Sequence, residues 1–107
     1  MKIIHIIDEK TWQMVKNQTQ YSGDSLQDQG FIHCCLPEQV DFVLNEWFSG
    51  RRDMILLELD SEKLDARLVF ENLEGGEEKF PHIYGPLNLD AVIAWYPTNI
   101  KKDDKHG

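Results

Sequence analysis

The apolar residues of the chain fall into short runs that predict a small domain built of strands and helices. The first run, Lys2–Ile7, is rich in β-branched residues and is interrupted only by His5, which is typical of a buried strand. Four later apolar runs predict further strands: Phe31–Leu36, Met54–Leu59, Ala66–Glu71 and Ala91–Tyr96. A single helical turn is predicted at Ser61–Leu64, directly before the fourth of these five strands.

The first two strands are predicted to be separated by a helix and a loop. The helix extends from about Glu9 to Lys16, with Asp8 as its N-cap and with Trp12 and Val15 facing inward. The segment Tyr21–Gln29 is polar and contains a glycine and two aspartates, so it is predicted to be a loop.

A second helix is predicted from about Pro37 to Phe48, because proline suits a first helical turn and Gly50 follows the last one. Its apolar residues recur at i, i+3, i+4 and i+7, and we expect them to face the core: Val40, Val43, Leu44 and Trp47. The resulting order, β-α-β-α-β-β-β, predicts a small α+β domain with two short helices against a mostly antiparallel sheet.

One unusual segment, Phe80–Leu87, connects the fourth and fifth predicted strands. It holds two prolines, which exclude a long helix. His82 and Tyr84 are two residues apart, so in an extended segment their side chains point to the same face. An imidazole that exchanges protons beside a phenol that donates a hydrogen bond could form part of a site. The alternative is a tight connection whose aromatic rings seal the core.

The composition bounds the size and surroundings of the protein. The chain of 107 residues predicts one domain over residues 1–100 and a frayed polar tail over residues 101–107. A formal net charge of −8 argues against bulk nucleic-acid binding and against binding to anionic membranes. No apolar run approaches the roughly 18–20 residues that span a bilayer, and the N-terminus does not resemble a signal peptide. We therefore expect a cytoplasmic protein.

Local positive charge could still hold a small anionic ligand. The candidates are Arg51, Arg52, Arg67 and Lys79, each of which is equally interpreted as a solvated surface charge.

Three places could carry chemistry: His33 on the second strand, Glu71 at the end of the fourth, and the pair of His82 and Tyr84. A carboxylate in the position of Glu71 could orient a ligand hydroxyl or stabilise a developing positive charge. Each residue also has a structural interpretation: His33 as a core histidine bonded to a backbone carbonyl, and Glu71 as a carboxylate in water.

Other chemistries have weaker support. Cys34 and Cys35 are adjacent, which suits neither a disulfide framework nor a redox motif, although either thiol could pair with His33 as a nucleophile. A metal site made by His33, His82 and a carboxylate lacks ligand spacing, so no metal is expected. Gly75 and Gly76 lie among glutamates and open no helix, which disfavours a phosphate-binding loop.

Several strings resemble the domain of unknown function 952 family, and together they cover roughly residues 2–97. They are Gly30–Cys34, Leu57–Asp60, Phe70-Glu71, Ala91-Val92 and, most specifically, Phe80–Leu87 with the sequence Phe-Pro-His-Ile-Tyr-Gly-Pro-Leu. The resemblance implies a fold similar to the ADP-ribosyltransferase fold, an α+β core with a split pair of sheets around a cleft. It also implies a cleft for NAD or another nucleotide-derived ligand.

The same resemblance implies roles for individual residues. His33 takes the role of the Arg or His on the first strand of an NAD-binding cleft, Tyr84 with His82 takes the aromatic role, and Glu71 is the acid. In the transferases the acidic residue comes last in the chain, whereas here Glu71 precedes His82 and Tyr84. Cys35 replaces a serine that is frequent in the family, which weakens a contact to a ribose. The expected function is ADP-ribosyl or phosphoryl transfer, or glycohydrolysis, on an NAD-like nucleotide; the alternative is a non-catalytic ligand-binding module.

Overall fold

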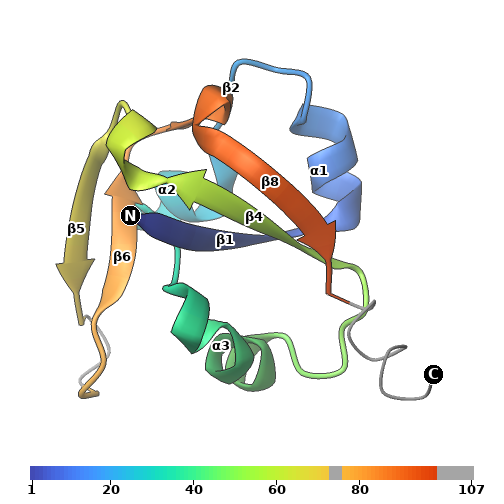
Figure 1. Cartoon of the computed structure of the whole chain (residues 1–107), viewed down its shortest axis with the longest axis vertical. Helices are drawn as coiled ribbons and strands as arrows, with labels where there is room; N and C mark the ends of the chain where they lie inside the picture. The colour runs from blue at the N-terminus through green and yellow to red at the C-terminus, as the bar shows by residue number, and fades with distance from the viewer. Residues whose placement is uncertain (73–75, 99–107) are drawn as a thin grey trace.

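Three antiparallel sheets and three short α-helices form the fold in the computed structural model, which describes residues 1–72 and 76–98 (Figure 1). The predicted α+β class with antiparallel pairing is confirmed, but the described residues form three α-helices rather than two. The predicted frayed tail, residues 101–107, lies outside the described residues. No helix in the described ranges is long and apolar enough to cross a bilayer.

The central sheet consists of β1 (Lys2–Asp8), β4 (Met54–Asp60) and β8 (Val92–Pro97), in the order β1-β4-β8. Figure 1 shows these three strands crossing the middle of the molecule. β4 lies between two partners and is an almost continuous apolar run, so nearly all its side chains are buried. The predicted first, third and fifth strands are confirmed within a few residues, and the predicted helical turn is a 3₁₀ turn, η2 (Ser61–Lys63).

A second sheet contains β3 (Ile32–His33), β6 (Phe80–Tyr84) and β5 (Arg67–Glu71), in the order β3-β6-β5. The sequence predicted no strand at β6, because prolines rarely occur in central strands. The Pro81 carbonyl accepts a hydrogen bond from the Cys34 N–H at 3.0 Å, just past the end of β3. In an antiparallel pair, the N–H and C=O of one residue point toward the same neighbouring strand. The nitrogen of Pro81 therefore faces the side of β3, and it lies where the pairing of β3 with β6 has already ended, so no ladder hydrogen bond is lost.

The predicted loop at Tyr21–Gln29 is wrong. The segment instead carries the end of β2 (Gln20–Tyr21), which pairs with β7 (Leu87–Asn88), and the helix α2 (Gly23–Gln29). None of the residues of α2 is buried, so the helix leaves no apolar period in the sequence. Gly30 ends it in the left-handed conformation, with φ of 89° and its N–H bonded to the Leu26 carbonyl.

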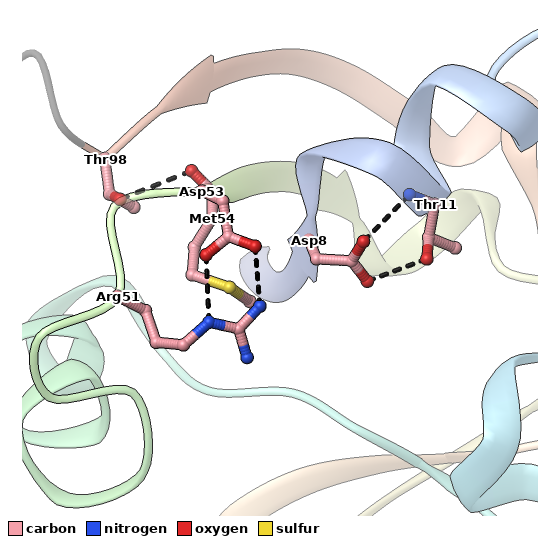
Figure 2. A network of polar contacts seen from close by, with 6 residues as sticks. All are labelled: Asp8, Thr11, Arg51, Asp53, Met54 and Thr98. Atoms are coloured by element: carbon pink, nitrogen blue, oxygen red, sulfur yellow. Dashed lines mark hydrogen bonds and ion pairs between the residues drawn. The ribbon is translucent and has the colours of Figure 1, made fainter.

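The helix α1 (Glu9–Val15) begins where the sequence predicts. The Asp8 carboxylate accepts hydrogen bonds from the Thr11 N–H at 2.9 Å and from the Thr11 hydroxyl at 2.7 Å. Figure 2 shows this cap beside the start of β4, where the Arg51 guanidinium binds the Asp53 carboxylate through two bonds of 2.9 and 2.7 Å. The Thr98 N–H donates to the Met54 carbonyl at 3.0 Å and ties the end of β8 to the same corner.

The helix α3 (Val40–Trp47) follows a 3₁₀ turn, η1 (Pro37–Gln39). Val40 and Val43 pack with Ile4, Cys35 and Leu56 in a small second core; the main core lies on the other face of β1. The prediction that Trp47 belongs to the core is wrong, since 52% of this residue is exposed. The Trp47 ring instead lies near Phe42 of the same helix and Phe80 of β6, with ring centroids 6.4 and 6.1 Å away.

Candidate functional site

A cleft of about 930 Å³ lies between α3 and the β3-β6-β5 sheet. Residues of β1, α2, β3, α3, β5, β6 and the segment before β6 line it. Three of the predicted site residues, His33, Glu71 and His82, share this lining, together with Cys35. Tyr84 does not line the cleft but contacts Glu71 at its edge. The fold thus brings together residues that are far apart in sequence.

The Glu71 carboxylate is the centre of the predicted cluster. Its Oε2 accepts a hydrogen bond from His82 Nδ1 at 2.9 Å and a short one from the Tyr84 hydroxyl. The antiparallel pairing of β5 with β6 produces this arrangement, because His82 and Tyr84 alternate with residues on the opposite face of β6. The predicted same-face placement of His82 and Tyr84 is confirmed.

These bonds set the charge states of the cluster. The hydrogen bonds from Tyr84 and His82 lower the pKa of Glu71, so the carboxylate is ionised at neutral pH. The same bond raises the pKa of Tyr84, which therefore remains a neutral donor. An ionised carboxylate can only accept, so His82 Nδ1 carries the proton of this hydrogen bond.

Phe31, which the sequence did not single out, joins these residues. Its ring stacks on His82 with centroids 4.2 Å apart and an interplanar angle of 24°. The centroid of the Phe31 ring is also 4.9 Å from that of His33. The rings of His33 and His82 are nearly perpendicular, with centroids 5.4 Å apart. Phe31 is buried, with 6% of its surface exposed, and it contacts both His33 and His82. Its ring therefore fixes the two imidazoles relative to each other.

The alternative interpretation of His33 as a core histidine does not hold; the core histidine in this region is His5. His33 is exposed, and its Nε2 lies 2.7 Å from the Gln29 Oε1 on α2. His5 Nδ1 donates to the His33 carbonyl at 2.6 Å, and burial lowers the pKa of His5 to about 4. His5 is therefore neutral at pH 7, and its buried Nε2 has no hydrogen-bond partner among the described residues.

Aromatic side chains from α3 and from the start of β6 also line the cleft. Phe42 and Trp47 on α3 are each 52% exposed, and their ring centroids are 6.4 Å apart. The ring centroid of Trp47 is 6.1 Å from that of Phe80. The sequence contains a signal for this wall: Phe42 is a large aromatic residue off the apolar stripe of an amphipathic helix. We refer to Phe42, Trp47 and Phe80 as the aromatic wall.

A buried glutamine fixes the acidic rim of the cleft. The Gln39 side chain accepts from the Leu36 N–H at 2.8 Å and donates to Glu78 Oε1 at 2.9 Å and to the Lys79 carbonyl at 3.0 Å. The start of α3 is thereby joined to the segment that leads into β6.

Thiol chemistry has no support in this environment. Cys34 and Cys35 are both buried, and burial raises the pKa of Cys34 and raises that of Cys35 to about 12. Both thiols are therefore protonated at neutral pH. Within residues 1–72 and 76–98, no three histidine, cysteine or acidic side chains lie together as metal ligands would.

The charge of the cleft differs from the expected cationic pocket. Of the candidate cations, Arg51 is paired with Asp53, and no lysine or arginine side chain lines the cleft in the part of the chain that the structure describes. The lining instead carries four carboxylates: Glu46, Glu71, Glu77 and Glu78. Arg67 stands on β5 opposite Tyr84, and its charge contributes to the lowered pKa of Glu71.

Comparison with known proteins supports the predicted family. The chain is similar to protein CC0527 from Caulobacter crescentus: a crystal structure is 30% identical, has a TM-score of 0.79, and is matched over 91% of this chain and 85% of that chain. A solution NMR structure of CC0527 is likewise 30% identical, with a TM-score of 0.76 over 89% and 82% of the two chains. No curated protein matches. The family model described as "Protein of unknown function (DUF952)" matches residues 6–95, so the chain belongs to that family.

Proposed function

We propose that the cleft binds NAD or another nucleotide-derived ligand and that Glu71, His82, Tyr84 and His33 act on it as an ADP-ribosyl transferase or glycohydrolase. One observation carries the proposal. An ionised carboxylate holds an imidazole and a phenol on a single oxygen beside an open cleft with an aromatic wall. The fold proposal is an ADP-ribosyltransferase-like core, and its support is a pair of three-stranded antiparallel sheets near such a cleft.

The reaction divides the work between these side chains. The bond from the ribose C1′ to the ring nitrogen of the leaving group breaks, and its electron pair leaves with that nitrogen. The negative charge of Glu71 favours the oxocarbenium-like carbon that forms. Water or an acceptor hydroxyl then bonds to C1′ and gives its proton to His82 Nε2. The Glu71 carboxylate stabilises the resulting imidazolium through Nδ1.

Phosphoryl transfer is the less favoured chemistry at this site. Charge developing on a transferred phosphoryl group needs Lys, Arg or a metal ion. The described lining holds no lysine or arginine side chain and adds four carboxylates.

The test combines binding with turnover. Thermal-shift and ligand-observed NMR measurements use NAD, ADP-ribose and 2′-phosphorylated RNA ends, and product formation is followed by chromatography. Glu71→Gln should leave ligand affinity within a few-fold while lowering turnover by at least about 10²-fold. Glu62→Gln, on an exposed turn away from the cleft, is the matched control and should do neither. The absence of binding by all three ligands would contradict the proposal.

A non-catalytic ligand-binding module is the second candidate, and one observation favours it. Glu71 Oε2 is already occupied by two donors from β6, which makes the carboxylate part of the structure of the sheet. In this case neither the parent protein nor Glu71→Gln turns over any ligand, and His33→Ala alone removes the affinity. Measurable turnover by the parent protein would exclude this candidate.

A further inference from the structure

We propose that the cleft selects a flat organic cation, the N-substituted pyridinium end of a nucleoside, and leaves phosphate groups outside. This inference rests on the proposed function, because it specifies which part of an NAD-like ligand enters the site. It is independent of whether catalysis follows.

The first support is the charge of the lining. Glu46, Glu77 and Glu78 line the cleft in addition to Glu71, and the described lining contains no lysine or arginine to offset them. Glu78 is bonded to the neutral amide of Gln39, which orients the carboxylate without cancelling its charge. A cation gains from this field, whereas a phosphate is repelled by it.

The second support is the aromatic wall. Trp47 and Phe42 remain about half exposed, and the faces of such rings attract cations that lie within about 6 Å of their centroids. Trp47 contacts both Phe42 and Phe80, so the three rings form one continuous apolar surface. A flat aromatic cation satisfies both features, because it stacks on the rings while its charge faces the carboxylates.

The experiment uses two probes that differ mainly in charge: 1-methylnicotinamide, a cation, and neutral nicotinamide. NMR titrations at low salt should give at least about fivefold tighter binding of the cation. Trp47→Leu and the double variant Glu46→Gln with Glu77→Gln should each reduce that preference to less than about twofold. Trp95→Leu, a matched change at an exposed tryptophan of β8 outside the cleft, should leave it unchanged.

Further probes separate this inference from the proposed function. If the cation binds but NAD and ADP-ribose do not, the inference stands and the nucleotide function fails. If ADP-ribose binds and 1-methylnicotinamide is no better than nicotinamide, the nucleotide function stands and the inference fails. If no probe shifts any cleft resonance, both are overturned. Thermal melts of each variant confirm that loss of binding does not come from loss of folding.

Discussion

At the scale of single residues, Glu71 determines the pKa of its neighbour Tyr84. The Tyr84 hydroxyl donates to the ionised carboxylate, which holds the pKa of Tyr84 above its usual value. In Glu71→Gln the acceptor is neutral, so we expect the pKa of Tyr84 to fall toward about 10. A pH titration of the Tyr84 ring resonances measures this change, and Glu62→Gln serves as the control. An unchanged titration would show that Glu71 does not determine the pKa of Tyr84.

His5 makes folding stability depend on pH. Its pKa is about 4 in the folded protein against 6.5 for an exposed histidine, so the unfolded chain binds an extra proton between these values. The contribution of neutral His5 to the free energy of unfolding is therefore fully present above pH 6.5. It falls as the pH drops from 6.5 to about 4 and is constant below that value. The total loss is about 3 kcal/mol, at 1.4 kcal/mol for each pKa unit.

His5→Asn tests this dependence, because the asparagine amide can still donate to the His33 carbonyl but does not titrate. We expect the difference in unfolding free energy between pH 7 and pH 4.5 to shrink by about 2–3 kcal/mol. Urea denaturation at the two pH values measures it. The slope that remains at lower pH comes from Asp8 and Glu71, whose carboxyl pKa values are also lowered by their hydrogen bonds. If the free energy of unfolding changes equally with pH in the parent protein and in His5→Asn, then His5 does not cause the pH dependence.

The sequence could identify some residues of the site better than others. The grouping of Glu71, His82 and Tyr84 follows from local signals, namely polar residues at strand ends and at a two-residue spacing. The role of His5 depends on a contact with a backbone carbonyl 28 residues away, and that of Phe31 depends on a ring stacked across the sheet. No local pattern records such contacts, so these residues could not be predicted.

At the scale of elements, α3 has a buried face and an exposed aromatic end. Val43→Ala removes two buried methyl groups and should lower the free energy of unfolding by about 2 kcal/mol. Trp47→Ala should cost less than about 1 kcal/mol, because half of the residue is already in water. Urea midpoints of the two variants give the comparison. The reverse order would show that the end of α3 is part of the core.

Elements with a strong apolar pattern are predicted within a few residues, and elements without one are missed. β1 and β4 are nearly continuous apolar runs, α3 buries Val40 and Val43 at a helical spacing, and α1 buries Trp12, so each sequence carries a signal. α2 has no fully buried residue; a single partly buried side chain, Leu26, packs against the main core, and Gly30 ends the helix. β6 contains a proline that is tolerated only because β3 ends early, a fact of tertiary pairing.

At the scale of the whole molecule, the net charge of −8 acts across the fold. The molecule measures 41 × 36 × 26 Å, which is comparable to the Debye length of about 30 Å at 0.01 M salt and larger than the value of about 10 Å at 0.1 M. Repulsion between like charges therefore extends over the molecule only at low salt. We expect Tm to rise between 10 and 100 mM NaCl. A fall in Tm would mean that attractive pairs such as Arg51 with Asp53 outweigh the repulsion.

The hairpin of β5 and β6 also bears on the order in which the site assembles. Glu71 is separated from His82 by 11 residues and from Tyr84 by 13, whereas β1 reaches β4 only after half of the chain. Closing a short loop costs less entropy than closing a long one, and hairpins form within about 1–10 μs. We expect the carboxylate, imidazole and phenol to meet early in folding, in a local unit that needs no distant strand. His33 joins them only when β3 docks, so the site is completed late although most of it is made early.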